Sequence, residues 1–234
     1  MDISSQFLVG GIWDSLMEIN GFRVVSQNFT FFLGGAGVTV ILTVLSVFFG
    51  MILGLFLGLG KLSHKSLIYG FSTIYIDFFR GTPLFVQILL LHFGILPMFI
   101  NSTAFVSGVI ACSLNSAAYI GEIVRAGIQA VDRGQMEAAR SLGMNERQAM
   151  RLVILPQAYK IVIPPLINEF IALLKDTSLV SVIAASELTH RGDLVYANTY
   201  QAAWVWSAVA LIYFVMTKIL SIMGDCIERS LATE

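Results

Sequence analysis

The fold is decided by the stretch EAARSLG at residues 137–143, which is followed by VILP at residues 153–156. The first lies within a polar interval, residues 132–155, and the second spans its end; segments that are apolar enough to cross a bilayer flank the interval. Good helix formers fill its first part, Gly143 can adopt the left-handed conformation that ends a helix, and an asparagine follows where a cap belongs. Pro156 then stops or kinks the second helix. The interval is therefore predicted to form two short helices joined by a glycine elbow at the membrane surface.

The composition places the chain among integral membrane proteins. Its 234 residues are 56% hydrophobic, with a mean hydropathy of +0.80, which is too apolar for a soluble domain of this size. The two cysteines lie in different apolar segments and suggest neither a disulfide framework nor a metal site. The sequence has no phosphate-binding loop, no motif of an intramembrane enzyme and no basic tract for nucleic acid. We therefore expect an all-α membrane protein without catalytic or metal-binding residues.

The apolar segments predict a transmembrane domain at residues 29–228. A span needs about 20 consecutive apolar residues, and the first segment has no charged residue from Phe29 to Leu59. Residues 1–28 carry apolar side chains at helical spacing and are expected to form an interfacial helix at the outer surface. Five spans are predicted, at residues 29–60, 66–98, 104–129, 157–184 and 201–226.

Small residues line one side of the first predicted span. Gly50, Gly54 and Gly58 recur at every fourth position, so they share one face of a helix. A ridge of small residues lets two backbones approach closely, and we expect another span to pack against it.

Positive charge is distributed unequally between the two sides of these spans. The outer side has only Arg23 and Arg191, against several acidic residues. Basic residues next to a span mark the cytoplasmic side, so the N-terminus is expected outside and the C-terminus inside. The cytoplasmic set consists of Lys61, Lys65, Arg133, Arg140, Arg147, Arg151, Lys160 and Arg229.

The second predicted span is interrupted near its middle. Gly81 is flexible and Pro83 lacks an amide hydrogen, so backbone groups are freed at membrane depth. Such groups are tolerated only inside protein or beside a wet cavity. Arg80 and Thr82 would then line a pathway; alternatively, the kink is purely structural and Arg80 pairs with Asp77.

The third predicted span carries polar groups on one face. Asn115 and Tyr119 are one helical turn apart, and Ser116 adjoins them. Polar groups in a span face protein or water rather than lipid. All three are candidates for a substrate pathway, although Asn115 suits a hydrogen bond between helices better than a ligand group.

The fourth predicted span contains Asn168 and two acids, Glu169 and Asp176, which are seven residues apart and share one face. A charge near the bilayer centre costs about 3 kcal/mol even on the lenient insertion scale. The acids therefore need compensation, either from Lys175 and Arg80 or from the ammonium group of a substrate. We expect Glu169 to receive that ammonium group or a cationic side chain.

Three of these stretches resemble one family of transport proteins. The pattern of EAA, a glycine four positions on and a later aliphatic-X-Leu-Pro resembles the cytoplasmic loop of permease subunits of binding-protein-dependent ABC importers, with Val153 where isoleucine is usual. FRGTPL at 79–84 and NSAAYIGE at 115–122 look like the polar amino acid branch, the histidine, glutamine, arginine and cystine permeases. The resemblance covers about residues 34–227.

The resemblance implies an ATP-driven importer of polar amino acids with the type I ABC importer permease fold, in the cytoplasmic (inner) membrane of a bacterium. In such importers a second permease copy or a related chain completes the pathway, and an extracytoplasmic binding protein delivers the amino acid. Separate ATPase subunits bind MgATP, so this chain would be no enzyme and would carry no cofactor.

The resemblance and the polar positions together give two sets of candidate residues. The set expected to couple to the ATPase is Glu137, Ala138, Ala139, Leu142, Gly143 and Pro156. The set expected to line the substrate pathway is Arg80, Gly81, Thr82, Pro83, Asn115, Ser116, Tyr119, Asn168, Glu169 and Asp176.

The alternative function is a secondary amino acid transporter. Such transporters normally show two matching halves with broken spans, and this sequence has no evident repeat. A requirement of uptake for ATP and a separate ATPase would distinguish the two.

Overall fold

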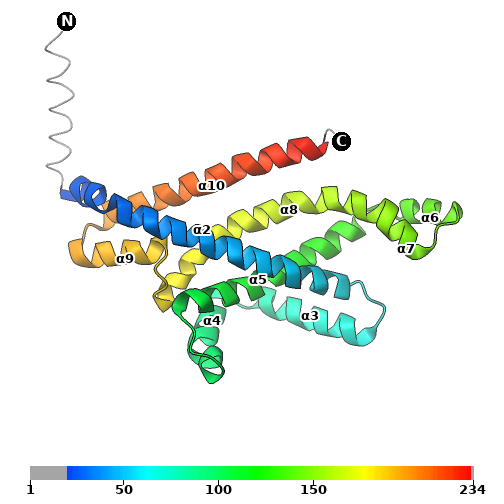
Figure 1. Ribbon diagram of the computed structural model, residues 1–234, viewed down its shortest axis with the longest axis horizontal. Coiled ribbons are helices and arrows are strands. Elements are labelled where there is room, and N and C mark those ends of the chain that lie inside the picture. Colours follow the sequence, from blue (N-terminus) through cyan, green and yellow to red (C-terminus); the bar gives the residue numbers. More distant parts are fainter. Residues whose placement is uncertain (1–19, 233–234) are drawn as a thin grey trace, which may run out of the picture.

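The computed structural model describes residues 20–232, and within them every regular element is a helix (Figure 1). The predicted interfacial helix falls largely on residues 1–19, which lie outside the described residues. From Asn20 onward the chain already belongs to α2 (Asn20–Gly60), so the first long helix includes residues that were expected to precede the first span.

The glycine ridge of α2 packs against α5 (Ala104–Gln129), as the spacing predicts. A Cβ atom added to Gly54 would lie 2.8 Å from the carbonyl oxygen of Ala117, and one added to Gly58 would lie 2.6 Å from that of Gly121. Real Cβ atoms do not approach carbonyl oxygens so closely, so only glycine fits. These two helices form the centre of the molecule, around which the others pack (Figure 1).

The second predicted span is a broken helix. α3 (Ser66–Gly81) ends before Pro83, and Thr82 has an extended backbone. The chain then continues through α4 (Leu84–Leu89), the π-helical η1 (Leu90–Ile95) and the short η2 (Leu96–Met98). The axis bends by 106° at the break, so the two halves do not form one straight crossing.

The polar interval and the fourth predicted span form one nearly continuous helical path. α6 (Arg133–Ser141) and α7 (Glu146–Ala149) are followed by the π-helical η3 (Met150–Ile154) and then by α8 (Leu155–Asp176). Pro156 lies in the first turn of α8, where its missing N–H has no helical acceptor, so it starts this helix instead of stopping the previous one. The predicted span at 157–184 corresponds to α8 and to the tighter helix η4 (Thr177–Ile183), which follows α8 directly after Asp176.

The last part of the described chain contains α9 (Leu188–Thr199) and α10 (Ala202–Ala232). In Figure 1, α6 and α7 lie at one end of the molecule and α9 at the other. Among the described helices, α2, α5 and α10 are long and apolar enough to cross a bilayer, and the bent pair around Thr82 provides a fourth crossing if counted as one. Because α8 contains prolines and polar residues, it is less apolar than these, and five spans remain a prediction.

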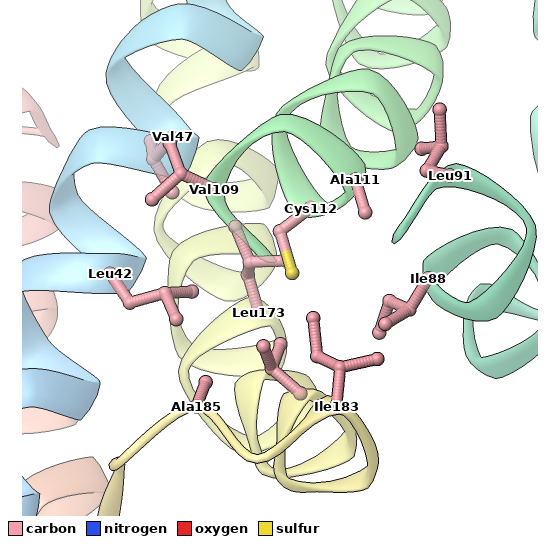
Figure 2. Packing of buried hydrophobic residues seen from close by; sticks show 11 residues of the cluster. Leu42, Val47, Ile88, Leu91, Val109, Ala111, Cys112, Leu173, Ile183 and Ala185 are labelled. Carbon is pink, nitrogen blue, oxygen red and sulfur yellow. The ribbon is translucent and has the colours of Figure 1, made fainter. Parts of the chain in front are cut away.

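The main hydrophobic core lies where α2, α4, α5, α8 and η4 meet. Figure 2 shows Cys112 of α5 pointing between Leu173 of α8 and Ile183 of η4, with Ile88 of α4 facing them. Ile88 is completely buried, so the half of the broken span beyond Pro83 is anchored in this core.

Candidate functional site

The elbow of the polar interval is closed by backbone hydrogen bonds. The N–H of Gly143 donates to the carbonyl of Arg140 at 3.0 Å, and the N–H of Met144 donates to that of Ala139 at 3.2 Å. This is the Schellman arrangement, which requires a left-handed residue after the helix. Gly143 supplies it with a φ of +87°. The glycine elbow expected from the sequence is therefore present.

Both short helices of the interval begin with a side-chain cap. The carboxylate of Asp132 accepts from the N–H of Gly134 at 2.7 Å at the start of α6. At the start of α7, Asn145 and Gln148 form a reciprocal capping box, with bonds of 3.0 and 2.9 Å. These caps satisfy N–H groups that a short helix leaves free, so the loop keeps a defined shape with little support from the core.

The interval presents one face to the protein and another to its surroundings. Ala139 and Ala149 are buried, and Val131, Ile154 and Ala158 form a small apolar cluster with Met136 of α6 and Met150 of η3. Leu142 at the elbow is 81% exposed, and Glu137 and Ala138 are exposed as well. The elbow therefore presents an apolar side chain to its surroundings, flanked by charged residues.

At the break, Arg80 contacts an aromatic ring and not an acid. Its guanidinium carbon lies 5.4 Å from the centre of the Tyr119 ring, within the range of a cation–π interaction. Within residues 20–232 it forms no ion pair, and Asp77 instead lies 3.8 Å from the ammonium group of Lys61. The alternative in which Arg80 pairs with Asp77 is therefore wrong, since Asp77 faces Lys61 and Arg80 faces Tyr119.

The Lys61 ammonium group also lies 3.3 Å from the carboxylate of Glu122, which accepts from Arg125 in addition. This cluster joins the end of α2 to α3 and α5. Glu122 and Arg125 are therefore members of an ion-pair cluster near the end of α5.

The backbone carbonyl groups left without a helical donor at the break accept hydrogen bonds from two buried side-chain amides, those of Gln87 and Asn115. The amide nitrogen of Gln87 donates to the Phe79 carbonyl at 2.9 Å, and that of Asn115 donates to the Gln87 carbonyl oxygen at 2.9 Å. Asn115 therefore forms a hydrogen bond between helices, the first of its two expected roles, and Thr82 lies in the same network. Gln87 was not anticipated, although an amide within the apolar run PLFVQILLL was a usable signal.

Ser116 and Glu169 meet across the α5–α8 contact. The Ser116 hydroxyl donates to the Glu169 carboxylate at 3.0 Å, and Ser116 is completely buried. Asn168 and Asp176 on the same helix as Glu169 are exposed in this chain. The structure thus brings Ser116 and Glu169 together, and Arg80 and Tyr119, whereas Asn168 and Asp176 contact neither pair through a hydrogen bond within the described residues.

A second buried acid lies near the end of the molecule opposite α6 and α7. Glu187 is fully buried and caps α9, accepting from the N–H groups of Thr189 at 2.8 Å and His190 at 2.7 Å. The Tyr213 hydroxyl donates to the same carboxylate at 2.9 Å, and Thr39 of α2 lies beside it. No role was predicted for this residue, because its partners come from three separate helices.

Comparison with known proteins gives a consistent set of relatives. The profile of the family described as "Binding-protein-dependent transport system inner membrane component" matches residues 50–233. The L-cystine transport system permease protein TcyB of Bacillus subtilis is 41% identical over 210 residues, which are 89% of this chain and 90% of that protein. The arginine transport system permease protein ArtQ of the same organism is 38% identical over 211 residues, 90% of this chain and 96% of ArtQ.

Two solved structures have the same arrangement of helices. A crystal structure of an amino acid ABC transporter with histidines contains a chain that is 45% identical, with a TM-score of 0.84, covering 88% of this chain and 96% of that one. A chain of the inward-facing methionine ABC transporter MetNI is 20% identical, with a TM-score of 0.77, over 88% of this chain and 98% of that one. The second likeness shows the fold alone.

Proposed function

The chain belongs to the inner membrane components of binding-protein-dependent transport systems, the permease subunits of ABC importers, and we propose that its substrates are polar amino acids. As a permease subunit it is a multi-pass membrane protein and no enzyme, and ATP hydrolysis takes place on a separate subunit. Membership of this family removes the alternative of a secondary transporter. The observation that carries the substrate class is that two opposite charges, Glu169 and Arg80, both contact α5, at Ser116 and at Tyr119, together with relatives named for cystine and arginine transport.

A free amino acid carries an ammonium group and a carboxylate, so its pathway needs groups for both. Glu169 lies on the α5–α8 contact and Arg80 lies beside the α3–α4 break, where it also contacts α5. In the proposal, Glu169 receives the ammonium group or a cationic side chain. Arg80 then provides the charged donor for the carboxylate, and the hydroxyls of Thr82 and Ser116 would add donors by exchanging their present bonds to the Phe78 carbonyl and to Glu169.

The proposed pathway lies between two permease chains. Asp77, Arg80, Asn168 and Asp176 are exposed in the single chain although they lie in predicted spans. Exposing charged groups to lipid is costly, so this face is expected to meet water or a second permease chain, either identical or related. The extracytoplasmic binding protein would deliver the amino acid at the end that carries α9, with the N-terminus outside and the C-terminus inside.

The polar interval is the proposed docking surface for the ATPase subunit, which binds MgATP. The exposed face of α6 and the elbow offers Leu142 between charged residues such as Glu137 and Arg140. The caps and the Schellman closure hold this face rigid, so a movement of the ATPase would be transmitted through η3 into α8, which carries Glu169.

The test is uptake by the purified permease reconstituted in vesicles with its ATPase and binding protein. We expect the vesicles to take up a polar amino acid only when ATP is present. Other polar amino acids that bind to the same transporter should compete with this uptake. Uptake that persists without the ATPase, or competition by non-amino-acid solutes alone, would contradict the proposal.

A further inference from the structure

We propose that Gln87 and Asn115 form an amide clamp that sets the angle between α3 and α4 and so positions Arg80 and Thr82 in the pathway. The effect on transport rests on the proposed function, whereas the effect on the angle does not. Both residues are buried, with 4% and 6% of their surfaces exposed. Neither contacts the exposed face where a substrate would pass, so both are positioning residues.

The clamp replaces the hydrogen bond that Pro83 removes. In a continuous helix the Phe79 carbonyl would accept from the N–H of residue 83, but proline has no amide hydrogen. Gln87 donates to this oxygen at 2.9 Å and Asn115 at 3.3 Å, so the orphaned carbonyl gains two side-chain donors, one from α4 and one from α5.

The same amide of Gln87 reaches the extended residue between the two helices. Its nitrogen lies 3.0 Å from the Thr82 carbonyl and 2.8 Å from the Thr82 hydroxyl oxygen. That hydroxyl donates in turn to the Phe78 carbonyl at 2.8 Å, so it accepts from Gln87. One side chain of α4 thus holds the last turn of α3 and the connecting residue together.

Asn115 ties this unit to α5. It donates to the Gln87 carbonyl oxygen at 2.9 Å, and it lies one helical turn before Tyr119, whose ring faces Arg80. The next residue in α4, Ile88, is fixed in the main core (Figure 2). The position of Arg80 therefore depends on the clamp, because the carbonyl of the preceding residue, Phe79, is bound to Gln87 of α4 and to Asn115 of α5.

The clamp needs amide chemistry at residue 87, since the side chain both donates to carbonyls and accepts from Asn115. Gln87→Glu keeps the size but has no N–H, and it faces the carbonyls of Phe79 and Thr82 with negative oxygens. Gln87→Met keeps the length without a strong donor or acceptor. Asn115→Asp removes the donor on the α5 side.

The test measures the angle and the transport separately, in the complete transporter reconstituted in vesicles. Spin labels at Ile74 and Phe93, both largely exposed, flank the break, and Cys226 is replaced by serine so that only these two sites react. We expect a broadened or shifted distance distribution in Gln87→Glu, Gln87→Met and Asn115→Asp. Asn198→Asp, an exposed amide on α9, is the matched control and should leave the distribution unchanged.

In the uptake assay we expect Gln87→Met to raise the half-saturating substrate concentration about tenfold, because buried carbonyls lose their donors and Arg80 moves. Copurification of the ATPase should not change, since its docking surface lies elsewhere. Unchanged distances in all three variants would overturn the clamp, whether or not the wild type imports amino acids. If Gln87→Glu fails to reach the membrane, the Gln87→Met and Asn115→Asp distances decide. Disturbed distances with a wild type that imports no amino acid would sink the proposed function and leave the clamp supported.

Discussion

Replacement of Gly143 by valine tests whether the shape of the elbow couples the ATPase to the spans. Gly143 has a φ of +87°, in the left-handed region that favours glycine, and no atom lies within 4 Å of the position its Cβ would take. A steric clash within this chain is therefore excluded, and a loss that follows the order of left-handed strain among the substitutions would come from the backbone. This makes the position a clean test of conformation in an exposed loop.

The expected loss of uptake in Gly143→Val follows from the cost of the left-handed backbone and from the two hydrogen bonds that close the elbow. A left-handed backbone costs an L-residue about 1–2 kcal/mol, and a β-branched side chain is at the upper end. If the elbow opens to relieve this strain, the bonds from Gly143 and Met144 at 3.0 and 3.2 Å are lost, at about 1 kcal/mol each. Because about 1.4 kcal/mol is a factor of ten, we expect the population with a closed elbow, and with it uptake, to fall at least about tenfold.

The assay compares a series of variants for ATP-dependent uptake and for ATPase activity stimulated by the loaded binding protein. The expected order of loss is Gly143→Val, then Gly143→Ala, then Gly143→Asn, because asparagine tolerates the left-handed region best. Membrane insertion should be unaffected throughout. Gly70→Ala, a helical glycine that also faces open space, serves as the control and should transport normally. Wild-type uptake by Gly143→Val, or no order among the three, would refute the coupling role.

Three further predictions concern the spans. Arg80→Ala and Tyr119→Leu should each lower uptake, and the double variant should lose less than the sum of the two, because each change removes the same cation–π contact. A double-mutant cycle should give a coupling energy of about 0.5–1 kcal/mol, and strict additivity would show that the contact has no role. Glu169→Gln keeps the shape and removes the charge, so it should reduce uptake more for a cationic than for a neutral amino acid while ATPase docking is unchanged. Normal uptake of every substrate by that variant would assign Glu169 to helix packing through Ser116. Gly54→Ala should destabilise the permease by about 1–3 kcal/mol, because its Cβ would lie 2.8 Å from a backbone carbonyl. Gly37→Ala on the same helix faces open space and is the control. Equal melting temperatures of the two variants in detergent would contradict the packing argument.

The sequence was sufficient to predict those structural features that depend only on residues a few positions apart. The elbow at Gly143 and the cap at Asn145 depend on residues a few positions away, so their residue types were enough to locate them. The glycine ridge of α2 also followed from spacing alone, because small residues every fourth position have few other uses in a span. The break at Pro83 followed from the missing amide hydrogen of proline.

Contacts between separate helices could be decided only by the tertiary structure. Asp77 and Arg80 are close in sequence, yet Asp77 pairs with Lys61 of the preceding loop and Arg80 with Tyr119 of α5, because the rotation of α3 directs them to different neighbours. The role of Gln87 depends on a 106° bend that brings α4 back toward the end of α3. Glu187 is held by partners from α2, α9 and α10, which no spacing in the sequence connects. A residue type states which bonds a side chain can form, but only the packing of the helices determines which partner is within reach.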